Sequence, residues 1–443
     1  MSQQQRIFFW SITAALGGFL FGFDTAVISG VEQSLQGLWE LSVWEHGLTV
    51  SMALVGTVLG AMLGGIPAER LGRRKTLFWI AVLYLVSSLG TALAMDWGTF
   101  LVFRFLGGLG VGASSVAAPM YITEISPAKS RGRLVALFQF NVVLGILIAY
   151  LSNYLLQDIG DNAWRWMLGV QALPSLLFLL AVLNIPESPR WLLLRKGNVD
   201  EAREVLKLID EENYTETLVA LQLSATQTAS QQKAKLFSAR YRTPVMLAVL
   251  FAVFNQVSGI NAIIYYAPRI FEMTGLGKSS ALLSSAGIGV INLLFTLLAM
   301  NLIDRFGRRT LMFIGSVGLI ITLGLVARAF YLEDFGGLSV PIFLFVYIAF
   351  FAFSQGGVIW VFISEIFPNE VRAQGQALGS FTHWLMAAII TFSFPYFAEA
   401  IGGAHTFLFF CLMMVVQLIF VWKYMPETKG TSLEQVGKSF VVH

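Results

Sequence analysis

Long apolar segments alternate with short polar ones along the whole chain. We count twelve apolar runs of about 20 residues, a length that lets a helix cross the hydrocarbon core of a bilayer. The pattern predicts an all-α membrane protein with twelve transmembrane helices. The runs lie near residues 7–30, 48–68, 76–95, 99–123, 134–157, 164–184, 243–271, 279–303, 310–330, 339–364, 374–398 and 404–424.

Composition supports this prediction. Hydrophobic residues make up 56% of the chain and charged residues 12%, whereas about 25% charged residues is usual for soluble domains. A globular core of this length cannot bury so much apolar surface, so the excess must face lipid. The lipid bilayer is therefore the first expected partner of the chain.

Short charged motifs recur in the same order about half a chain apart, as in a parallel repeat of a membrane bundle. This duplication predicts two six-helix lobes around a central cleft, the architecture of a transporter. We expect lobes at 1–186 and 241–430, a cytoplasmic linker at 187–240 and a cytoplasmic tail at 431–443. The matching motifs are ERLGRR at 69–74 and DRFGRR at 304–309, the segments 124–132 and 365–373, and Pro186-Glu187-Ser188 and Pro426-Glu427-Thr428.

The positive charges predict the orientation. Most of the 29 Lys and Arg residues fall on the side that holds both termini, and that side is the cytoplasm by the positive-inside rule. The net charge of +3 reflects this topology and gives no reason to expect nucleic acid as a partner. The first run carries Asp24 where a cleaved signal would end, so we expect it to be retained. The five cations elsewhere are Arg104, Arg165, Arg269, Lys278 and Arg328.

Short loops and termini favour a bacterial inner membrane, and we expect a functional monomer. The linker contains a helical pattern from Asp200 to Asp210, with Val205, Leu206 and Ile209 on one face. This spacing predicts short cytoplasmic helices that pack under the bundle. A plain linker is the alternative.

Several motifs of other protein classes can be set aside. The lone Cys411 excludes an internal disulfide framework and a zinc site. The glycines at 107–112 lie inside an apolar run with no preceding strand, where small residues allow close helix packing. Gly277-Lys278-Ser279 lacks the earlier glycine of a phosphate-binding loop. We therefore expect no enzyme, no metal and no cofactor.

Asp24 is the one charged residue between Ile7 and Gly30. A carboxylate at mid-bilayer costs about 3 kcal/mol on insertion scales, so it is expected to be paired or functional. Arg104 lies at a comparable depth on the fourth run, and the two side chains can meet. An Asp24 separated from Arg104 in an apolar cleft would favour protonation, because desolvation penalises the charged form. The pair predicts a proton switch; a static ion pair between two helices is the alternative.

The duplicated motifs place carboxylates and guanidinium groups together at cytoplasmic helix ends. We expect Glu124 with Arg131, and Glu365 with Arg372, to pair across Pro127 and Pro368. These groups would form a network that closes the cytoplasmic side. Simple anchoring by positive charge is the alternative, but anchoring would not require matched carboxylates. The candidate gate residues are Glu69, Arg73, Glu124, Arg131, Glu187, Arg190, Asp304, Arg308, Glu365, Arg372 and Glu427.

Amides and aromatic residues gather in the later runs. Amide groups have both donors and acceptors, which suits a neutral ligand rich in hydroxyl groups. A break at Gly259 would let Gln256 and Asn261 converge, because a regular helix points them to different faces. Interhelical polar contacts and ordinary aromatic packing are the alternatives. The candidates are Gln139, Asn255, Gln256, Asn261, Asn292, Trp360, His383 and Trp384.

Four motifs identify a family that the chain resembles. GFDTAVISG at 22–30, PESPRW at 186–191, QVSGIN at 256–261 and PETKG at 426–430 resemble the sugar porter family of the major facilitator superfamily. The resemblance covers essentially the whole chain and implies the twelve-helix, two-lobe fold. It also implies that Asp24 and Arg104 couple proton movement. Sugar contacts are implied for Gln139, Gln256, Asn261, Asn292, Trp360 and Trp384.

The chain departs from the family pattern at two of the candidate positions. Asn255 stands where the family usually has glutamine, and His383 stands where asparagine or glutamine is common. We retain both as candidate sugar contacts. Ile146 is apolar at a site that is apolar in glucose carriers and polar in xylose carriers, which favours a hexose such as glucose.

The resemblance implies uptake of a monosaccharide together with a proton, by alternating access around a midplane site. Facilitative members typically lack the acid at the position of Asp24, so its presence favours symport. A proton-independent facilitative uniporter and a pentose or polyol proton symporter are the alternatives. A sugar sensor without turnover is disfavoured, because the tails are short. The expected partners are a monosaccharide and a proton.

Overall fold

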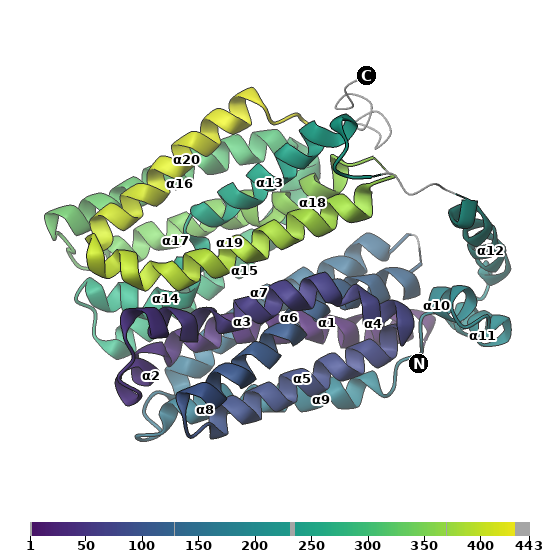
Figure 1. Cartoon of the computed structure of the whole chain (residues 1–443), viewed down its shortest axis with the longest axis horizontal. Coiled ribbons are helices and arrows are strands. Elements are labelled where there is room, and N and C mark those ends of the chain that lie inside the picture. The colour runs from purple at the N-terminus through teal and green to yellow at the C-terminus, as the bar shows by residue number, and fades with distance from the viewer. Residues whose placement is uncertain (1, 128, 231–234, 369, 430–443) are drawn as a thin grey trace. The chain divides into compact units, whose positions relative to one another are not determined.

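Every regular element in the described part of the chain is helical (Figure 1). The computed structural model describes residues 2–127, 129–230, 235–368 and 370–429. Within these ranges, 12 helical segments are long and apolar enough to cross a membrane. The prediction of an all-α membrane protein with twelve spans is confirmed. The expected tail at 431–443 lies outside the described residues.

Several spans consist of more than one helical element. The first six are α1 (Gln3–Val27) with η1 (Ile28–Gly30), α3 (Val43–Leu63) with α4 (Gly65–Arg70), α5 (Arg73–Leu93), α6 (Trp97–Ile125), α7 (Arg131–Leu156), and α8 (Ala163–Gly169) with α9 (Ala172–Val182). The last six are η2 (Ala239–Tyr241) with α13 (Arg242–Val257) and α14 (Ile260–Met273), α15 (Lys278–Phe306), α16 (Arg308–Leu332), α17 (Ser339–Phe351) with η3 (Ala352–Gly356) and α18 (Gly357–Glu365), α19 (Arg372–Ala400), and α20 (Gly402–Lys423).

The second span begins five residues before the start expected from hydropathy. The expected start was too late because Glu45 and His46 are polar, so the first turn of the helix is not part of the apolar run. In the structure the Ser42 backbone N–H donates to the Glu45 carboxylate at 2.9 Å. The Ser42 hydroxyl in turn accepts from the Glu45 N–H at 3.4 Å, so the two residues form a capping box at the start of α3. His46 is fully buried.

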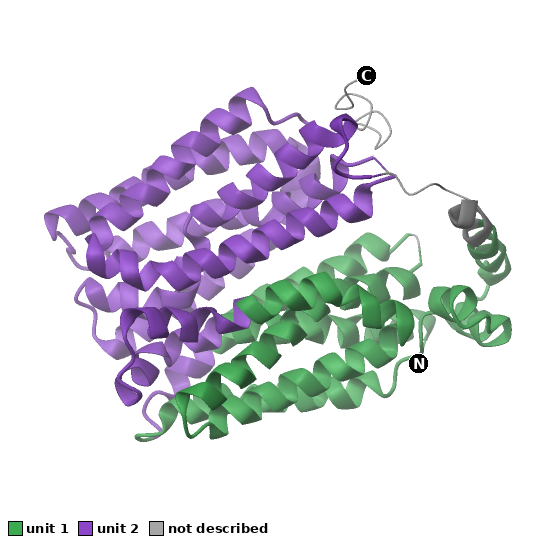
Figure 2. Cartoon of the chain, viewed as in Figure 1, with its two compact units in different colours: residues 1–25, 55–149, 160–232 green, residues 26–54, 150–159, 233–443 purple. Residues whose placement is uncertain are grey.

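The chain divides into two compact units (Figure 2). Unit 1 comprises residues 1–25, 55–149 and 160–232, and unit 2 comprises residues 26–54, 150–159 and 233–443. The short segment α2 (Glu32–Leu38) and the start of α3 belong to unit 2. Each unit contains one copy of the duplicated charged motifs.

Glycines allow α1 and α7 to approach closely in unit 1. A Cβ at Gly22 would lie 1.8 Å from the Val142 carbonyl oxygen, and a Cβ at Gly145 would lie 2.0 Å from the Phe19 carbonyl oxygen. Small residues permit such backbone contact between membrane helices. The glycine run of α6 serves the same purpose, since a Cβ at Gly112 would lie 2.2 Å from the Thr57 carbonyl oxygen.

Short helices follow the sixth span, as the sequence predicts. They are α10 (Pro189–Leu194), α11 (Val199–Ile209) and α12 (Tyr214–Ser230). In α11 the apolar face is buried, including Val205, Leu206 and Ile209. The segment is therefore a set of helices rather than a plain linker.

Substitution Gly22→Ala tests the close approach of α1 and α7. The added methyl group has no room, and overpacking of this kind costs about 1–3 kcal/mol. We expect a lower apparent Tm in detergent. Gly65→Ala is the matched control, because no atom lies within 4 Å of a Cβ there. An equal Tm for the two variants would contradict the packing argument.

Candidate functional site

A buried ion pair lies inside unit 1. The Arg104 Nη1 of α6 donates to the Asp24 Oδ1 of α1 at 2.9 Å. The side chains are 1% and 4% exposed, respectively. Gly107 lies one turn after Arg104, and a Cβ there would be 3.6 Å from Asp24 Oδ1. The structure thus brings together the two residues that the sequence singles out for proton coupling.

The Asp24–Arg104 pair is sparsely supported by other polar groups. Gln171 lies within hydrogen-bonding range of the Asp24 carboxyl group and is itself buried. In the described part of the chain, Arg104 Nε and Nη2 have no hydrogen-bond partner. A guanidinium that depends on one carboxylate becomes an uncompensated buried charge when that carboxylate is neutralised. Protonation of Asp24 would therefore destabilise this arrangement of α1 and α6, because Arg104 would lose its countercharge.

A helix break in unit 2 makes buried amides converge. α13 ends at Val257, and Gly259 adopts a left-handed conformation with φ of +86° before α14 begins. Only glycine adopts this conformation without strain, and a Cβ there would lie 2.5 Å from the Phe410 ring. Across the break, the Asn261 Nδ2 donates to the Gln256 Oε1 at 2.6 Å. The predicted break is present.

The same amides continue into a polar chain. The Gln256 Nε2 donates to the Asn255 Oδ1 at 3.0 Å, and the Asn255 Nδ2 donates to the Gln355 carbonyl oxygen at 3.4 Å. The Gln256 Nε2 also lies 3.3 Å from both ring nitrogens of His383. His383 therefore joins the amides directly. Sequence analysis did not single out Gln355.

Aromatic rings lie beside these amides. The His383 ring centroid is 4.8 Å from those of Trp360 and Trp384. The two indole rings are 6.5 Å apart. Trp360 is 37% exposed, whereas Trp384 and His383 are buried. An indole ring offers an apolar face beside polar groups, a combination that suits a ring-shaped ligand with hydroxyl groups.

The two remaining predicted contacts lie on α15 and α7. Asn292 is half-buried on α15 and accepts a hydrogen bond from the Thr296 hydroxyl of the same helix at 3.4 Å. Gln139 is half-buried on α7 in unit 1. Both stay predictions as ligand contacts.

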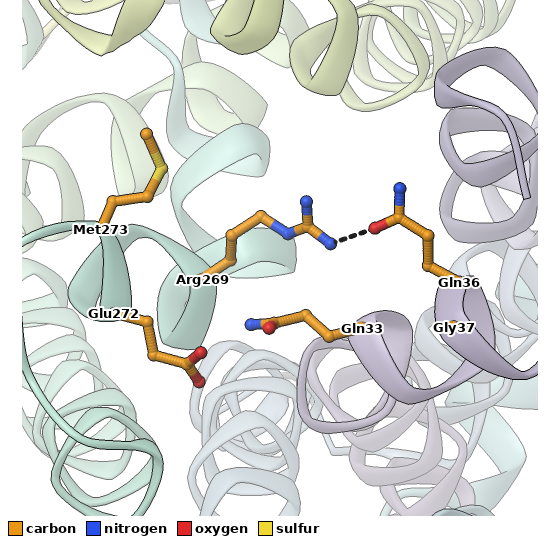
Figure 3. Close-up of a pocket in the computed structure, with 6 residues that line it drawn as sticks. All are labelled: Gln33, Gln36, Gly37, Arg269, Glu272 and Met273. Carbon is orange, nitrogen blue, oxygen red and sulfur yellow. Dashed lines mark hydrogen bonds between the residues drawn. The ribbon is translucent and has the colours of Figure 1, made fainter. Parts of the chain in front are cut away.

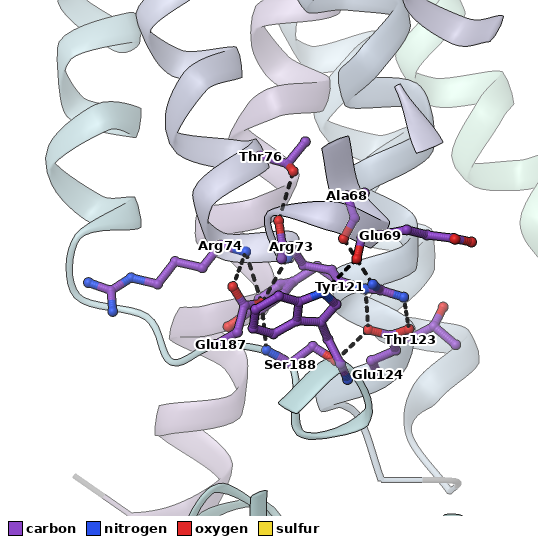
Figure 4. A network of polar contacts seen from close by, with 12 residues as sticks. Ala68, Glu69, Arg73, Arg74, Thr76, Tyr121, Thr123, Glu124, Glu187 and Ser188 are labelled. Atoms are coloured by element: carbon purple, nitrogen blue, oxygen red, sulfur yellow. Dashed lines mark hydrogen bonds and ion pairs between the residues drawn. The ribbon is translucent and has the colours of Figure 1, made fainter. Parts of the chain in front are cut away.

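Charged groups form a network at one end of unit 1 (Figure 4). Arg73 donates to both oxygens of Glu124, through Nε and Nη2, at 2.9 Å each. The Ser188 hydroxyl donates to the same carboxylate at 2.5 Å. Glu187 accepts from the backbone N–H groups of Arg73 and Ser188 at 2.8 Å each. Burial raises the pKa of Glu187 above its ordinary value despite these donors.

Unit 2 repeats this network with equivalent residues. Arg308 donates to both oxygens of Glu365 at 3.1 and 2.8 Å, and the Thr428 hydroxyl donates to the same carboxylate at 2.6 Å. Glu427 accepts from the backbone N–H groups of Arg308 and Arg309 at 2.9 and 3.0 Å. The duplicated motifs therefore fold into duplicated geometry.

A glycine makes each network possible. Gly72 and Gly307 have φ of +101° and +90°. A Cβ at these positions would lie 2.3 Å from the Glu187 carboxylate and 2.5 Å from the Glu427 carboxylate, respectively. The glycine of each charged motif thus leaves room for the acid that binds the following N–H groups.

Some pairings differ from those expected. Glu124 pairs with Arg73 of the charged motif at 69–74, rather than with Arg131. Glu365 pairs with Arg308 of the charged motif at 304–309, rather than with Arg372. Arg131 and Arg372 donate to backbone carbonyl oxygens instead, those of Ser126 and Phe367, at 3.5 and 3.2 Å.

The remaining gate candidates lie nearer to solvent. Glu69 pairs with Arg195, and both side chains are more than half exposed. Asp304 pairs with Arg308 at 3.1 Å from a largely exposed position. Arg190 is exposed.

Sequence analysis missed a further buried cluster in unit 2, formed by Glu32, His46 and Arg269. Glu32 and His46 border apolar runs, and Arg269 is 237 residues away from Glu32 in the chain. The signal available in the sequence was Arg269 itself, a cation near the end of a span on the side with few positive charges.

Known proteins match the chain along nearly its whole length. The family described as "Sugar (and other) transporter" matches residues 10–440. An arabinose-proton symporter from Bacillus subtilis (strain 168) is 37% identical over 97% of this chain and 94% of its own length. A glucose transport protein from Synechocystis sp. is 35% identical over 96% of this chain and 95% of its own length.

A solved structure shows the same fold. The inward open conformation of the xylose transporter XylE from E. coli matches with a TM-score of 0.87 at 33% identity, over 98% of this chain and 100% of that chain. The twelve apolar helices identify an integral membrane protein. The family expected from the motifs is thereby confirmed, and it is a family of transporters rather than enzymes. The chain belongs to the sugar porter family of the major facilitator superfamily.

Proposed function

We propose that the protein takes up a monosaccharide together with a proton, by alternating access. The observation that carries this proposal is the buried Asp24–Arg104 pair. A carboxylate is costly inside a membrane unless it has a role or a partner. Here the Asp24 carboxylate has Arg104 and the nearby Gln171 as its donors, so a proton on Asp24 can take the place of the ion pair once Asp24 separates from Arg104. The relative from Bacillus subtilis, an arabinose-proton symporter, supports the same activity.

In the proposed cycle, Asp24 takes a proton from outside before sugar binds. The amide cluster of Asn255, Gln256 and Asn261 supplies donors and acceptors to the sugar hydroxyl groups. Trp360, His383 and Trp384 supply apolar ring faces beside them. Gln139 and Asn292 are proposed as further sugar contacts. The two lobes, 1–186 and 241–430, would rock about the bound sugar and release it with the proton inside.

We propose a hexose such as glucose as the substrate. Ile146 is buried and apolar, so its side chain offers no hydrogen bond to a ligand. The glucose transport protein from Synechocystis supports a hexose, whereas the arabinose and xylose relatives make a pentose the leading alternative. A polyol remains a further alternative, and a proton-independent uniporter is the second candidate mechanism.

The two charged networks are proposed to act as the cytoplasmic gate. Each lies within one unit and holds a helix turn against the segment after the sixth or twelfth span. We propose that both termini lie in the cytoplasm, a placement that the distribution of positive charges supports. We propose a bacterial inner-membrane protein that functions as a monomer.

Substitution Asp24→Asn tests proton coupling. An inward gradient of one pH unit supplies about 1.4 kcal/mol, enough for up to about tenfold sugar accumulation. We expect the wild-type protein in proteoliposomes to accumulate sugar and alkalinise the medium. Asp24→Asn should show counterflow without accumulation, because the side chain can no longer exchange a proton. Asp161→Asn, an exposed acid, is the matched control. Accumulation by Asp24→Asn at the wild-type level would contradict the proton switch.

A counterflow panel tests the substrate. Proteoliposomes loaded with glucose, xylose, arabinose or inositol would be compared at one pH. We expect glucose to drive the fastest exchange, and Ile146→Gln to raise the rate with xylose relative to glucose, because an amide adds a hydrogen-bonding group. Fastest exchange with a pentose or with inositol would replace the hexose assignment and leave symport untouched.

The networks predict matched losses of stability. Glu124→Gln and Glu365→Gln each leave a partly buried guanidinium with one acceptor oxygen in place of two and without its negative partner, at a cost of about 1–3 kcal/mol. We expect both to lower the apparent Tm in detergent and to increase cysteine labelling from the cytoplasmic side. Glu69→Gln should do neither, since its pair with Arg195 is exposed. Unchanged labelling in both buried variants would argue against a gate.

A further inference from the structure

A second buried ion pair lies in unit 2, outside the site described above. Arg269 of α14 donates to both oxygens of Glu32, from Nε at 2.9 Å and from Nη2 at 2.8 Å. The His46 Nε2 of α3 contacts the same carboxylate at 2.5 Å. Arg269 Nη2 also donates to the Gln36 Oε1 at 2.6 Å, and Figure 3 shows these two side chains pointing toward one another.

The burial of this cluster is asymmetric. Glu32 and His46 are 0% exposed, whereas the Arg269 side chain is 27% exposed. Arg269 reaches solvent through a pocket of about 540 Å³, also lined by Gln33, Gln36, Gly37, Glu272 and Met273 (Figure 3). Water can therefore reach the guanidinium first when the pair separates.

The Glu32 carboxylate stays charged, unlike a group that trades a proton. Burial raises the pKa of Glu32, but the hydrogen bond from His46 and the positive charge of Arg269 outweigh burial and hold that pKa below its ordinary value. The pair therefore persists above the ordinary pKa of a glutamate and weakens only as the pH falls through the lowered value. His46 Nδ1 has no hydrogen-bond partner among the described residues, so the ring contacts its surroundings through Nε2, which faces the Glu32 carboxylate.

The pair joins the two sequence repeats. Glu32 and His46 follow the first span, inside the repeat that ends near residue 186, and Arg269 belongs to the second repeat. No other ion pair within 4.0 Å in the described part of the chain joins the first repeat to the second, although Arg195 and Arg240 of the segment between them pair with Glu69 and Glu370. Glu32–Arg269 thus joins the two repeats, whereas the Arg73–Glu124 and Arg308–Glu365 pairs each lie within one repeat.

Close packing surrounds the ion pair. A Cβ at Gly47 would lie 2.2 Å from the Phe392 carbonyl oxygen, and the Trp44 ring stacks on Tyr396 with centroids 4.5 Å apart. η1 packs on α14. The segment 28–47 therefore packs against α14 through η1 and against α19 through Trp44 and Gly47.

We propose that Glu32, His46 and Arg269 form an ion-pair latch that closes the non-cytoplasmic end of the transporter and breaks each time that end opens. The proposal rests on the alternating access proposed above, in which the two repeats separate at one end and then at the other. A buried ion pair suits a reversible latch, because its attraction is largely offset by the cost of desolvating both charges. Hydration of Glu32 and Arg269 compensates for the lost contact when the latch opens.

Cysteine labelling tests the latch. Cys411 is the one cysteine of the chain, so Cys411→Ser provides the background. Ser29→Cys in buried η1 reports opening near the latch, and Ser364→Cys on α18 reports the cytoplasmic end. Membrane-impermeant maleimide would be added to each side of oriented vesicles. No sugar or pH gradient is needed.

Breaking the latch should have opposite effects at the two ends. We expect Glu32→Gln and Arg269→Gln each to raise the Ser29→Cys labelling rate about tenfold or more, since loss of one partner leaves a buried charge uncompensated. Labelling of Ser364→Cys should fall. The double variant should equal the single variants, because they remove the same interaction. Glu45→Gln changes a half-buried acid that is bonded to Ser42 and not to the latch, and it should leave both rates unchanged.

Two outcomes would overturn the proposal. The first is that Glu32→Gln leaves the labelling rate of Ser29→Cys equal to the rate in the protein with Glu32 intact. The second is that Glu32→Gln raises the labelling rate of Ser29→Cys but does not lower that of Ser364→Cys, which would indicate local loosening. If Glu32→Gln does not fold, Arg269→Lys decides, because it keeps the charge and loses the paired hydrogen bonds. If the labelling rates do not change in opposite directions while uptake is still driven by protons, the latch is contradicted and symport is not. If the labelling rates change in opposite directions but uptake does not depend on protons, symport is contradicted and the latch is not.

Discussion

A carboxylate inside a membrane helix needs a compensating charge, and Asp24 depends on Arg104 for it. The two side chains lie on different helices and are almost completely buried, so α1 and α6 must keep them 2.9 Å apart while the protein is unprotonated. That requirement accounts for Gly107 beside the pair, where a larger residue would press on Ser87, 2.4 Å from a Cβ. The helix packing of unit 1 and the proposed proton chemistry both follow from this one interaction.

The acids that pair with a buried arginine differ in how many donors they receive, and this difference fits the different roles proposed for them. Asp24 receives one hydrogen bond from Arg104, with Gln171 nearby. Glu124 receives two from Arg73 and one from Ser188, and Glu32 receives two from Arg269 in addition to the His46 contact. A carboxylate with many donors is stabilised as an anion, whereas one with few donors is more easily neutralised. The poorly supported acid is therefore the natural place for a proton to bind.

Much of this could be predicted from the sequence, because bilayer thickness fixes the length of apolar runs and duplication fixes the pairing of motifs. The twelve spans and the break at Gly259 follow from local patterns, and the meeting of Asp24 with Arg104 follows from their comparable depth in the bilayer. The exact ion-pair partners could not be predicted in this way. Glu124 pairs with Arg73, which is 51 residues earlier, instead of with the nearer Arg131. The Glu32–Arg269 pair was invisible for the same reason, since only the tertiary fold brings residues 237 positions apart into contact. Whether the amide and indole cluster binds sugar depends on chemistry that hydropathy does not encode.

The left-handed glycines of the charged turns also limit how the two halves of the chain can diverge. At Gly72 and Gly307 any side chain would meet both an unfavourable backbone angle and the oxygen atoms of Glu187 or Glu427. No neighbouring substitution relieves both problems at once, since shortening the acid would leave the backbone strain in place. Side chains at these two positions are therefore expected to be poorly tolerated, so the same glycine-and-acid arrangement constrains the first and the second half of the chain alike.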